Sequence, residues 1–253
     1  MPLQTRSGSG LTLAPELSLP PPYTPVRLRE FGNAFEHALK LAPEHGAGTL
    51  TYVGRFDLAE FALVLEPEEP LVQARRAFIA GMAALADALA ALAEPETAIN
   101  IDWPDLVYVN SGLVGGGRLA WPQGTGEDEV PDWLVFGAMI RTASMPGSEP
   151  GANPEITALD EEGFGETLSS HVVESFARNF MVALDAWRES GFGAVAKSYF
   201  DYFPREKGLR RDIDDNGDFL LRRMASSDVE RNALLPRLAE PGWYDPKTKS
   251  PRA

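Results

Sequence analysis

The sequence predicts an α+β fold, in which a mixed, mainly antiparallel sheet packs with helices and a small β-rich domain follows towards the C-terminus. Strand-like and helix-like segments are mixed without regular βαβ alternation. Hairpin turns are the clearest local signals, with Asn-Ser-Gly at residues 110–112 and Asn-Gly at residues 216–217. Because a hairpin joins antiparallel neighbours, we expect the main sheet to be largely antiparallel.

The first hundred residues predict two helices and two strands. Apolar residues near helical spacing predict a helix over residues 26–41. Residues 48–54 and 61–66 are short β-like runs. Residues 71–93 are rich in Ala and Leu, which is typical of a long buried helix, and Pro95 ends it.

Strands dominate the middle of the chain. We expect them at residues 98–101, 106–110, 113–121 and 133–142. Residues 123–130 and 145–154 are rich in turn-forming or acidic residues, so we expect loops there.

The last third begins with helices and then changes character. Apolar residues at intervals of three and four predict a helix over residues 168–190, and a shorter one over residues 192–202. A hairpin and a short helix near residues 228–238 follow. The expected organisation is a flexible N-terminal arm (residues 1–25), a main domain (residues 26–204) and a small C-terminal domain with a tail (residues 205–253).

Composition excludes several classes of function. The 253 residues are 44% hydrophobic and 24% charged, as in an ordinary globular protein. A net charge of -14 argues against nucleic acid and anionic membranes as partners. The absence of cysteine excludes disulfides and thiolate chemistry, and the histidines lack spaced partners, so we expect no metal site. We expect a cytoplasmic protein.

The segment of residues 102–118 is the best candidate for a binding site. Trp103-Pro104-Asp105 is either a pocket wall with a polar group or the start of a strand with a stacked indole. Three successive glycines either let a ligand approach the backbone or form a bulge in an edge strand. Arg118 and Arg55 would each clamp a carboxylate or phosphate, or form a surface ion pair. The predicted ligand-binding residues are Arg55, Trp103, Pro104, Asp105, Gly115, Gly116, Gly117 and Arg118.

Residues 102–119 resemble the Lys-Trp-Pro-Asn-Asp region of biotin protein ligases and the related lipoate ligases. The order of elements around them is similar too, from the Gly54-Arg55 loop to the glycine-containing strand at residues 134–141 and the hairpin at residues 211–221. This resemblance implies a biotin/lipoate ligase-like catalytic domain. It also implies ATP-dependent attachment of biotin, lipoate, octanoate or a related acid to a lysine of a biotinyl or lipoyl carrier domain. ATP with Mg²⁺ would be required, and a homodimer stays open.

This chain departs from the family's pattern where positive charge is expected. The Gly-Arg-Gly-Arg-Arg-Gly loop of the family is reduced to Gly54-Arg55. Asp102 stands where the family has the lysine before Trp-Pro, and a second lysine would fall near Leu113. Formation of an acyl-adenylate needs cations near the phosphates. We therefore assign no catalytic residue, and the alternative is a non-catalytic protein that binds a small acid or cofactor on the same scaffold.

Overall fold

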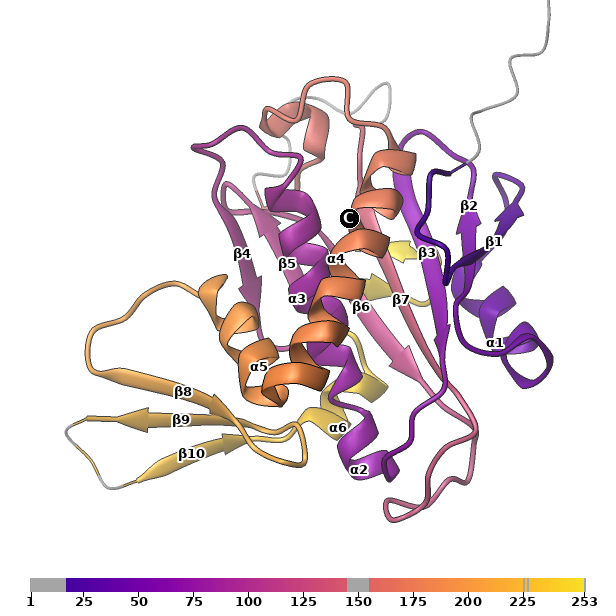
Figure 1. The fold of residues 1–253 in the computed structure, drawn as a ribbon. Coiled ribbons are helices and arrows are strands. Elements are labelled where there is room, and N and C mark those ends of the chain that lie inside the picture. The colour runs from indigo at the N-terminus through magenta and orange to yellow at the C-terminus, as the bar shows by residue number, and fades with distance from the viewer. Residues whose placement is uncertain (1–16, 145–154, 225, 227, 253) are drawn as a thin grey trace, which may run out of the picture.

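The computed structural model describes residues 17–144, 155–224, 226 and 228–252. Its centre is a seven-stranded sheet with the order β1-β2-β3-β7-β6-β5-β4 (Figure 1). The strands are β1 (Thr24–Leu28), β2 (Thr49–Val53), β3 (Leu58–Leu65), β4 (Ile99–Asp102), β5 (Leu106–Val109), β6 (Gly112–Ala120) and β7 (Leu134–Arg141). Neighbours are antiparallel except β1 and β2, which are parallel. The predicted fold class, with a mainly antiparallel sheet, is confirmed.

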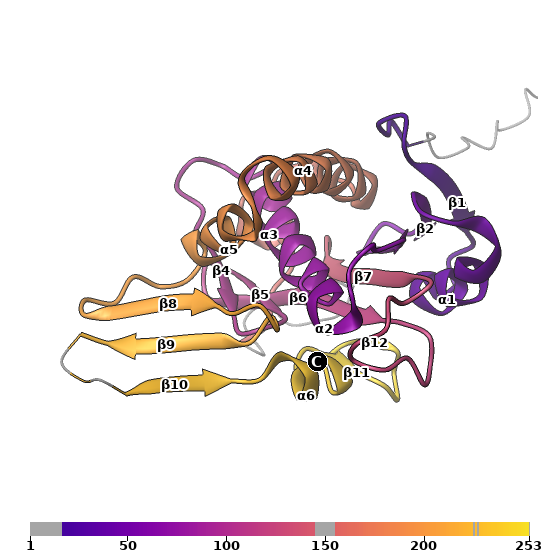
Figure 2. The ribbon, with the colours of Figure 1, turned by 60° about the horizontal axis from the view of Figure 1, so that its bottom comes forward.

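Different parts of the chain cover the two faces of this sheet. The helical face packs against α3 (Ala77–Ala90) and α4 (Ser169–Ser190), with α5 (Phe192–Asp201) beside them. The other face, here called the opposite face, packs against α1 (Ala34–His45) and the segment that follows α6 (Leu234–Ala239) (Figure 2). Two short helices, α2 (Leu71–Ala74) and the 3-10 helix η1 (Leu159–Glu162), complete the set.

Closely packed phenylalanine rings hold the helical face together. Phe176 of α4 lies 4.6 Å from Phe61 and 5.5 Å from Phe136, measured between ring centroids. Gly81 of α3 has no room for a side chain, because a Cβ there would lie 2.3 Å from the Phe136 ring. Aromatic burial of this kind dominates the stability of a core, so the sheet is a rigid base for whatever lies on its opposite face.

A small β-rich domain follows α5. It contains β8 (Leu209–Ile213), β9 (Phe219–Arg223) and β10 (Val229–Asn232) in an antiparallel sheet. Asp214 Oδ1 accepts the N–H groups of Asn216 and Asp218, each at 2.9 Å, and Gly217 has a φ of +81°. The predicted hairpin is therefore confirmed, while the division near Pro204 stays a prediction. Among the strands of the described ranges, the two-residue strands β11 (Tyr244–Asp245) and β12 (Ser250–Pro251) pair with each other and with no other strand.

Three helix predictions need correction. Residues 26–28 belong to β1, and the first helix begins only at Ala34, because the Asn33 side chain accepts the Glu36 N–H and caps α1 there. The long helix over residues 71–93 is divided into α2 and α3 at Arg75 and Arg76. In the segment 228–238, the first residues form β10 and only the last ones form α6.

The described part of the expected N-terminal arm lies against α4. The Ser18 N–H donates to Glu174 at 2.8 Å, and the Tyr23 hydroxyl donates to the Ala177 carbonyl at 2.9 Å. Residues 1–16 and the loop expected at residues 145–154 lie outside the described residues. Among the helices in the described ranges, none combines the length and hydrophobicity needed to cross a bilayer.

Candidate functional site

Trp103, Pro104 and Asp105 follow β4, and their side chains contact different parts of the chain. The Trp103 ring stacks on Phe219 of the small domain at 5.2 Å and lines a cavity of about 460 Å³. Asp105 Oδ2 instead accepts the N–H of Gly242 at 2.6 Å. Asp105 is only 4% exposed, and this burial raises its pKa to about 6. The tripeptide thus connects the sheet with two separate parts of the C-terminal region.

The three glycines of β6 leave no room for side chains. A Cβ on Gly115, which has a φ of +154°, would lie 1.9 Å from a carbonyl oxygen of β7. A Cβ on Gly116 would lie 1.9 Å from the Asp105 carbonyl oxygen, and one on Gly117 would lie 2.5 Å from Met82 Sδ. The register of β5 and β6 shifts beside them, so a bulge is present, but β6 is an internal strand.

An indole ring of the protein itself fills the recess over Gly116. Trp243 Cδ1 lies 2.4 Å from the position that a Gly116 Cβ would take. Its Nε1–H donates to the Gly117 carbonyl at 2.8 Å, and its side chain is fully buried. A ring therefore does approach the glycine backbone, and it belongs to the C-terminal segment, defined here as residues 242–252.

Arg118 is a buried cation on the opposite face, two residues beyond Gly116. It is 7% exposed, and its guanidinium carbon lies 3.9 Å from the Phe35 ring centre and 4.4 Å from that of Tyr244. One Nη atom lies 3.5 Å from Asn33 Oδ1. Within the described ranges, no carboxylate forms an ion pair with Arg118. Burial lowers its pKa, yet an arginine stays protonated in proteins. A buried charge normally has a partner of opposite sign, so this arrangement suits an anion from outside the chain.

Glu60 of β3 is a buried acidic group in the same region. It is 4% exposed, and its Oε1 accepts the Ala34 N–H at the start of α1 at 2.8 Å. Burial raises the pKa of Glu60, while the Ala34 N–H, Arg118 and Arg55 act against this shift. Glu60 therefore links α1 to the sheet through a hydrogen bond, and its negative charge partly offsets the positive charge of Arg118.

Arg55, the other predicted arginine, already has a partner. Its Nε donates to Asp57 Oδ1 at 2.7 Å, and a second contact makes the pair bidentate. This hydrogen bonding raises the pKa of Arg55. Arg55 and Arg118 both act on Glu60, but of the two only Arg118 has no ion pair within the described ranges.

A cavity of about 530 Å³ lies next to Asn33, whose side-chain oxygen is 3.5 Å from Arg118. It lies between the start of α1 and the C-terminal segment, and Asn33 lines it. Arg29, Lys40 and Lys249 also line it, and none of them forms an ion pair in the part of the chain that the structure describes. The lining also carries Glu36, so three cations face one carboxylate in a protein of net charge -14, and this excess of positive charge favours anions.

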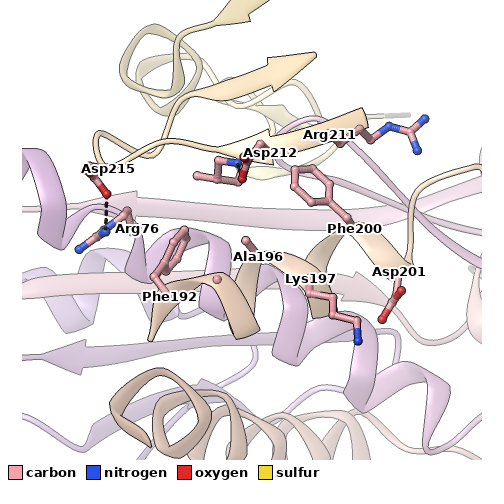
Figure 3. Close-up of a pocket in the computed structure, with 11 residues that line it drawn as sticks. Arg76, Phe192, Ala196, Lys197, Phe200, Asp201, Arg211, Asp212 and Asp215 are labelled. Atoms are coloured by element: carbon pink, nitrogen blue, oxygen red, sulfur yellow. Dashed lines mark hydrogen bonds and ion pairs between the residues drawn. The ribbon is translucent and has the colours of Figure 1, made fainter. Parts of the chain in front are cut away.

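A second cavity of about 530 Å³ lies between α5 and β8 (Figure 3). Its lining carries three cations and three carboxylates: Arg76, Lys197, Arg211, Asp201, Asp212 and Asp215. Arg76 and Asp215 approach each other to 3.9 Å. Because the charges balance and no predicted site residue lines it, this cavity is a weaker candidate for an anionic ligand.

The sequence alone did not suggest several residues of this site, namely Asn33, Phe35, Glu60, Trp243 and Tyr244. Two of these residues stand in sequence patterns that could have identified them. Glu60 is the one charge within the apolar run Leu58–Leu65, and Asn33 precedes a helical pattern in the manner of an N-cap. No local sequence pattern would place Trp243 and Tyr244 of the C-terminal segment against β6.

The comparisons with known proteins agree with this architecture. The model of the Biotin/lipoate A/B protein ligase family matches residues 19–201. The biotin–[acetyl-CoA-carboxylase] ligase of Paracoccus denitrificans is 28% identical over 187 residues, which cover 66% of this chain and 75% of that protein.

Solved structures show the same fold. A biotin protein ligase-like protein of unknown function from Silicibacter sp. TM1040 aligns with a TM-score of 0.75 at 25% identity, covering 88% of this chain and 99% of the other. The biotin protein ligase of Aquifex aeolicus aligns with a TM-score of 0.60 at 15% identity, covering 83% and 99%. The resemblance to the biotin/lipoate protein ligases is thereby confirmed. The chain belongs to the biotin/lipoate A/B protein ligase family.

Proposed function

We propose that this protein binds a small carboxylic acid of the biotin or lipoate kind, with the acid's carboxylate on Arg118. The observation that carries this proposal is that Arg118 is 7% exposed and forms no ion pair with a carboxylate in the described ranges. A ligand carboxylate would supply the missing charge with bidentate geometry. The other predicted residues, from Arg55 to Gly117, stay proposals for the surroundings of the acid.

The reaction that we propose is a ligation that uses ATP with Mg²⁺. A carboxylate oxygen of the acid attacks the α-phosphorus and pyrophosphate leaves; a carrier-domain lysine then attacks the acyl carbon and AMP leaves. The Paracoccus relative is a ligase by name, and the Aquifex ligase has been solved with biotin and ATP at a TM-score of 0.59 to this chain. These likenesses support the reaction type, with a biotinyl or lipoyl carrier domain as the partner.

A second candidate is acid binding without transfer. It is favoured by Asp102 and Leu113, which stand where the resemblance places lysines, and by the absence of any lysine between Lys40 and Lys197. Leu113 packs in a cluster with Trp243.

One experiment separates the two candidates. The protein is incubated with MgATP and biotin, lipoate or octanoate, and both pyrophosphate release and the melting temperature are measured. A ligase releases pyrophosphate with one acid, whereas a binding protein shows only a ligand-induced rise in melting temperature. If neither signal changes with any acid, acid binding itself is wrong.

A further inference from the structure

The C-terminal segment stands between Arg118 and solvent. Tyr244 covers one face of the guanidinium and Phe35 covers another, at 4.4 and 3.9 Å from the ring centres. Trp243, the neighbour of Tyr244, fills the recess over Gly116. Tyr244 also forms a side-chain hydrogen bond with Arg118, so an acid that pairs with the guanidinium N–H groups competes with Tyr244, and displacing Tyr244 moves its covalent neighbour Trp243 as well.

The fully buried Trp243 ring and a few polar contacts hold this segment on the sheet. Its strands β11 and β12 form two residue pairs with each other and join no strand of the seven-stranded sheet. Its polar anchors are the Gly242 N–H on Asp105, the Trp243 indole on Gly117 and the contact of Arg141 with the Arg252 carbonyl. Isolated two-stranded hairpins are marginal in water, and segments with few anchors open locally before the whole protein unfolds.

We propose that the C-terminal segment is a displaceable occupant of the recess over Gly116, so that Trp243 and the acid ligand occupy the site in turn. This inference rests on the acid-binding function proposed above. Trp243 fills the recess and donates a hydrogen bond to the Gly117 carbonyl, so the ligand-free site stays closed and its buried carbonyl stays satisfied. The affinity for the acid is then lowered by the stability of the closed state.

A reversible crosslink tests this directly. The chain has no cysteine, so Leu106→Cys combined with Gly242→Cys creates a single pair. A Cβ on Gly242 would lie 3.8 Å from Leu106 Cγ, which places the two sulfur atoms within reach of each other. The oxidised protein holds the segment closed, and the reduced protein is its own control. The single variants L106C and G242C control for altered packing.

We expect the oxidised double variant to bind biotin, lipoate or octanoate about tenfold or more weakly than the reduced form, measured by isothermal titration. Equal affinity in the two forms overturns the inference while leaving acid binding intact. If the reduced form and the wild type bind no acid, the proposed function is wrong.

Amide hydrogen exchange tests, without any ligand, whether the C-terminal segment opens locally. In wild-type protein, the amides of Gly242, Lys249 and Arg252 are hydrogen-bonded within or from the segment. We expect them to exchange at least about 100-fold faster than the amides of β3 and β7, because the segment opens locally. Exchange only through global unfolding would overturn the inference.

Discussion

At the scale of single residues, the guanidinium of Arg118 lies against two aromatic rings and has no ion pair within the described ranges. Its desolvation disfavours the folded state, while the two cation–π contacts compensate in part. We expect Arg118→Met, which preserves much of the side-chain volume, to leave the free energy of unfolding within about 1 kcal/mol of wild type or to raise it. Urea denaturation measures this. A loss above about 3 kcal/mol would mean that Arg118 is needed for the fold itself.

Asp105 predicts a dependence of stability on pH. Its pKa of about 6 in the folded protein exceeds the ordinary value of 3.8, so the folded state retains a proton that the unfolded state has lost. The contribution of Asp105 to stability therefore falls as pH rises from about 4 to about 6, by up to roughly 3 kcal/mol.

Asp105→Asn is the matched variant, because an amide oxygen still accepts the Gly242 N–H without a charge. We expect it to be more stable than wild type above pH 7 and to match wild type near pH 4. Urea midpoints measured across this range test the sign. A wild-type advantage that grows with pH would show that the buried carboxylate is stabilising.

At the scale of elements, the close packing of β6 makes its glycines necessary for the sheet. We expect Gly116→Ala to cost about 3 kcal/mol or more, because its Cβ would collide with the Asp105 carbonyl oxygen, which cannot move without shifting the backbone. Gly193→Ala in α5 is the control. A Cβ there meets no atom within 4 Å, so stability should be unchanged or rise by up to about 1 kcal/mol. Thermal denaturation of both variants tests this; equal effects would contradict the packing argument.

The elements that the sequence predicted best are those with local turn chemistry. Asn110 and Ser111 have positive φ values, as the predicted turn between β5 and β6 requires, and Gly217 does the same between β8 and β9. The predicted start of the first helix was wrong because residues 24–28 pair with β2, which is distant in sequence. Helical spacing of apolar residues cannot reveal such a pairing.

At the scale of the whole molecule, the sequence predicted the fold and offered Arg118 as a candidate, but it did not predict the cluster of residues around Arg118. Arg118 was a candidate because it follows the three glycines. Phe35, Glu60 and Tyr244 reach it from a helix, another strand and the C-terminal segment. Their proximity depends on the order of strands and on the path of the tail over the opposite face, and a single sequence carries no signal for either.

The proposed function makes Arg118 the partner of a ligand carboxylate, and a matched pair of ligands tests this most directly. Biotin and biotinamide, and lipoate and lipoamide, are titrated calorimetrically into wild type and Arg118→Met. We expect one acid to bind wild type about 30-fold or more tightly than its amide, since a desolvated charge pair contributes about 2 kcal/mol or more. This preference should disappear in the variant. Equal binding of acid and amide to wild type, or an undiminished preference for the acid in Arg118→Met, would contradict the assignment.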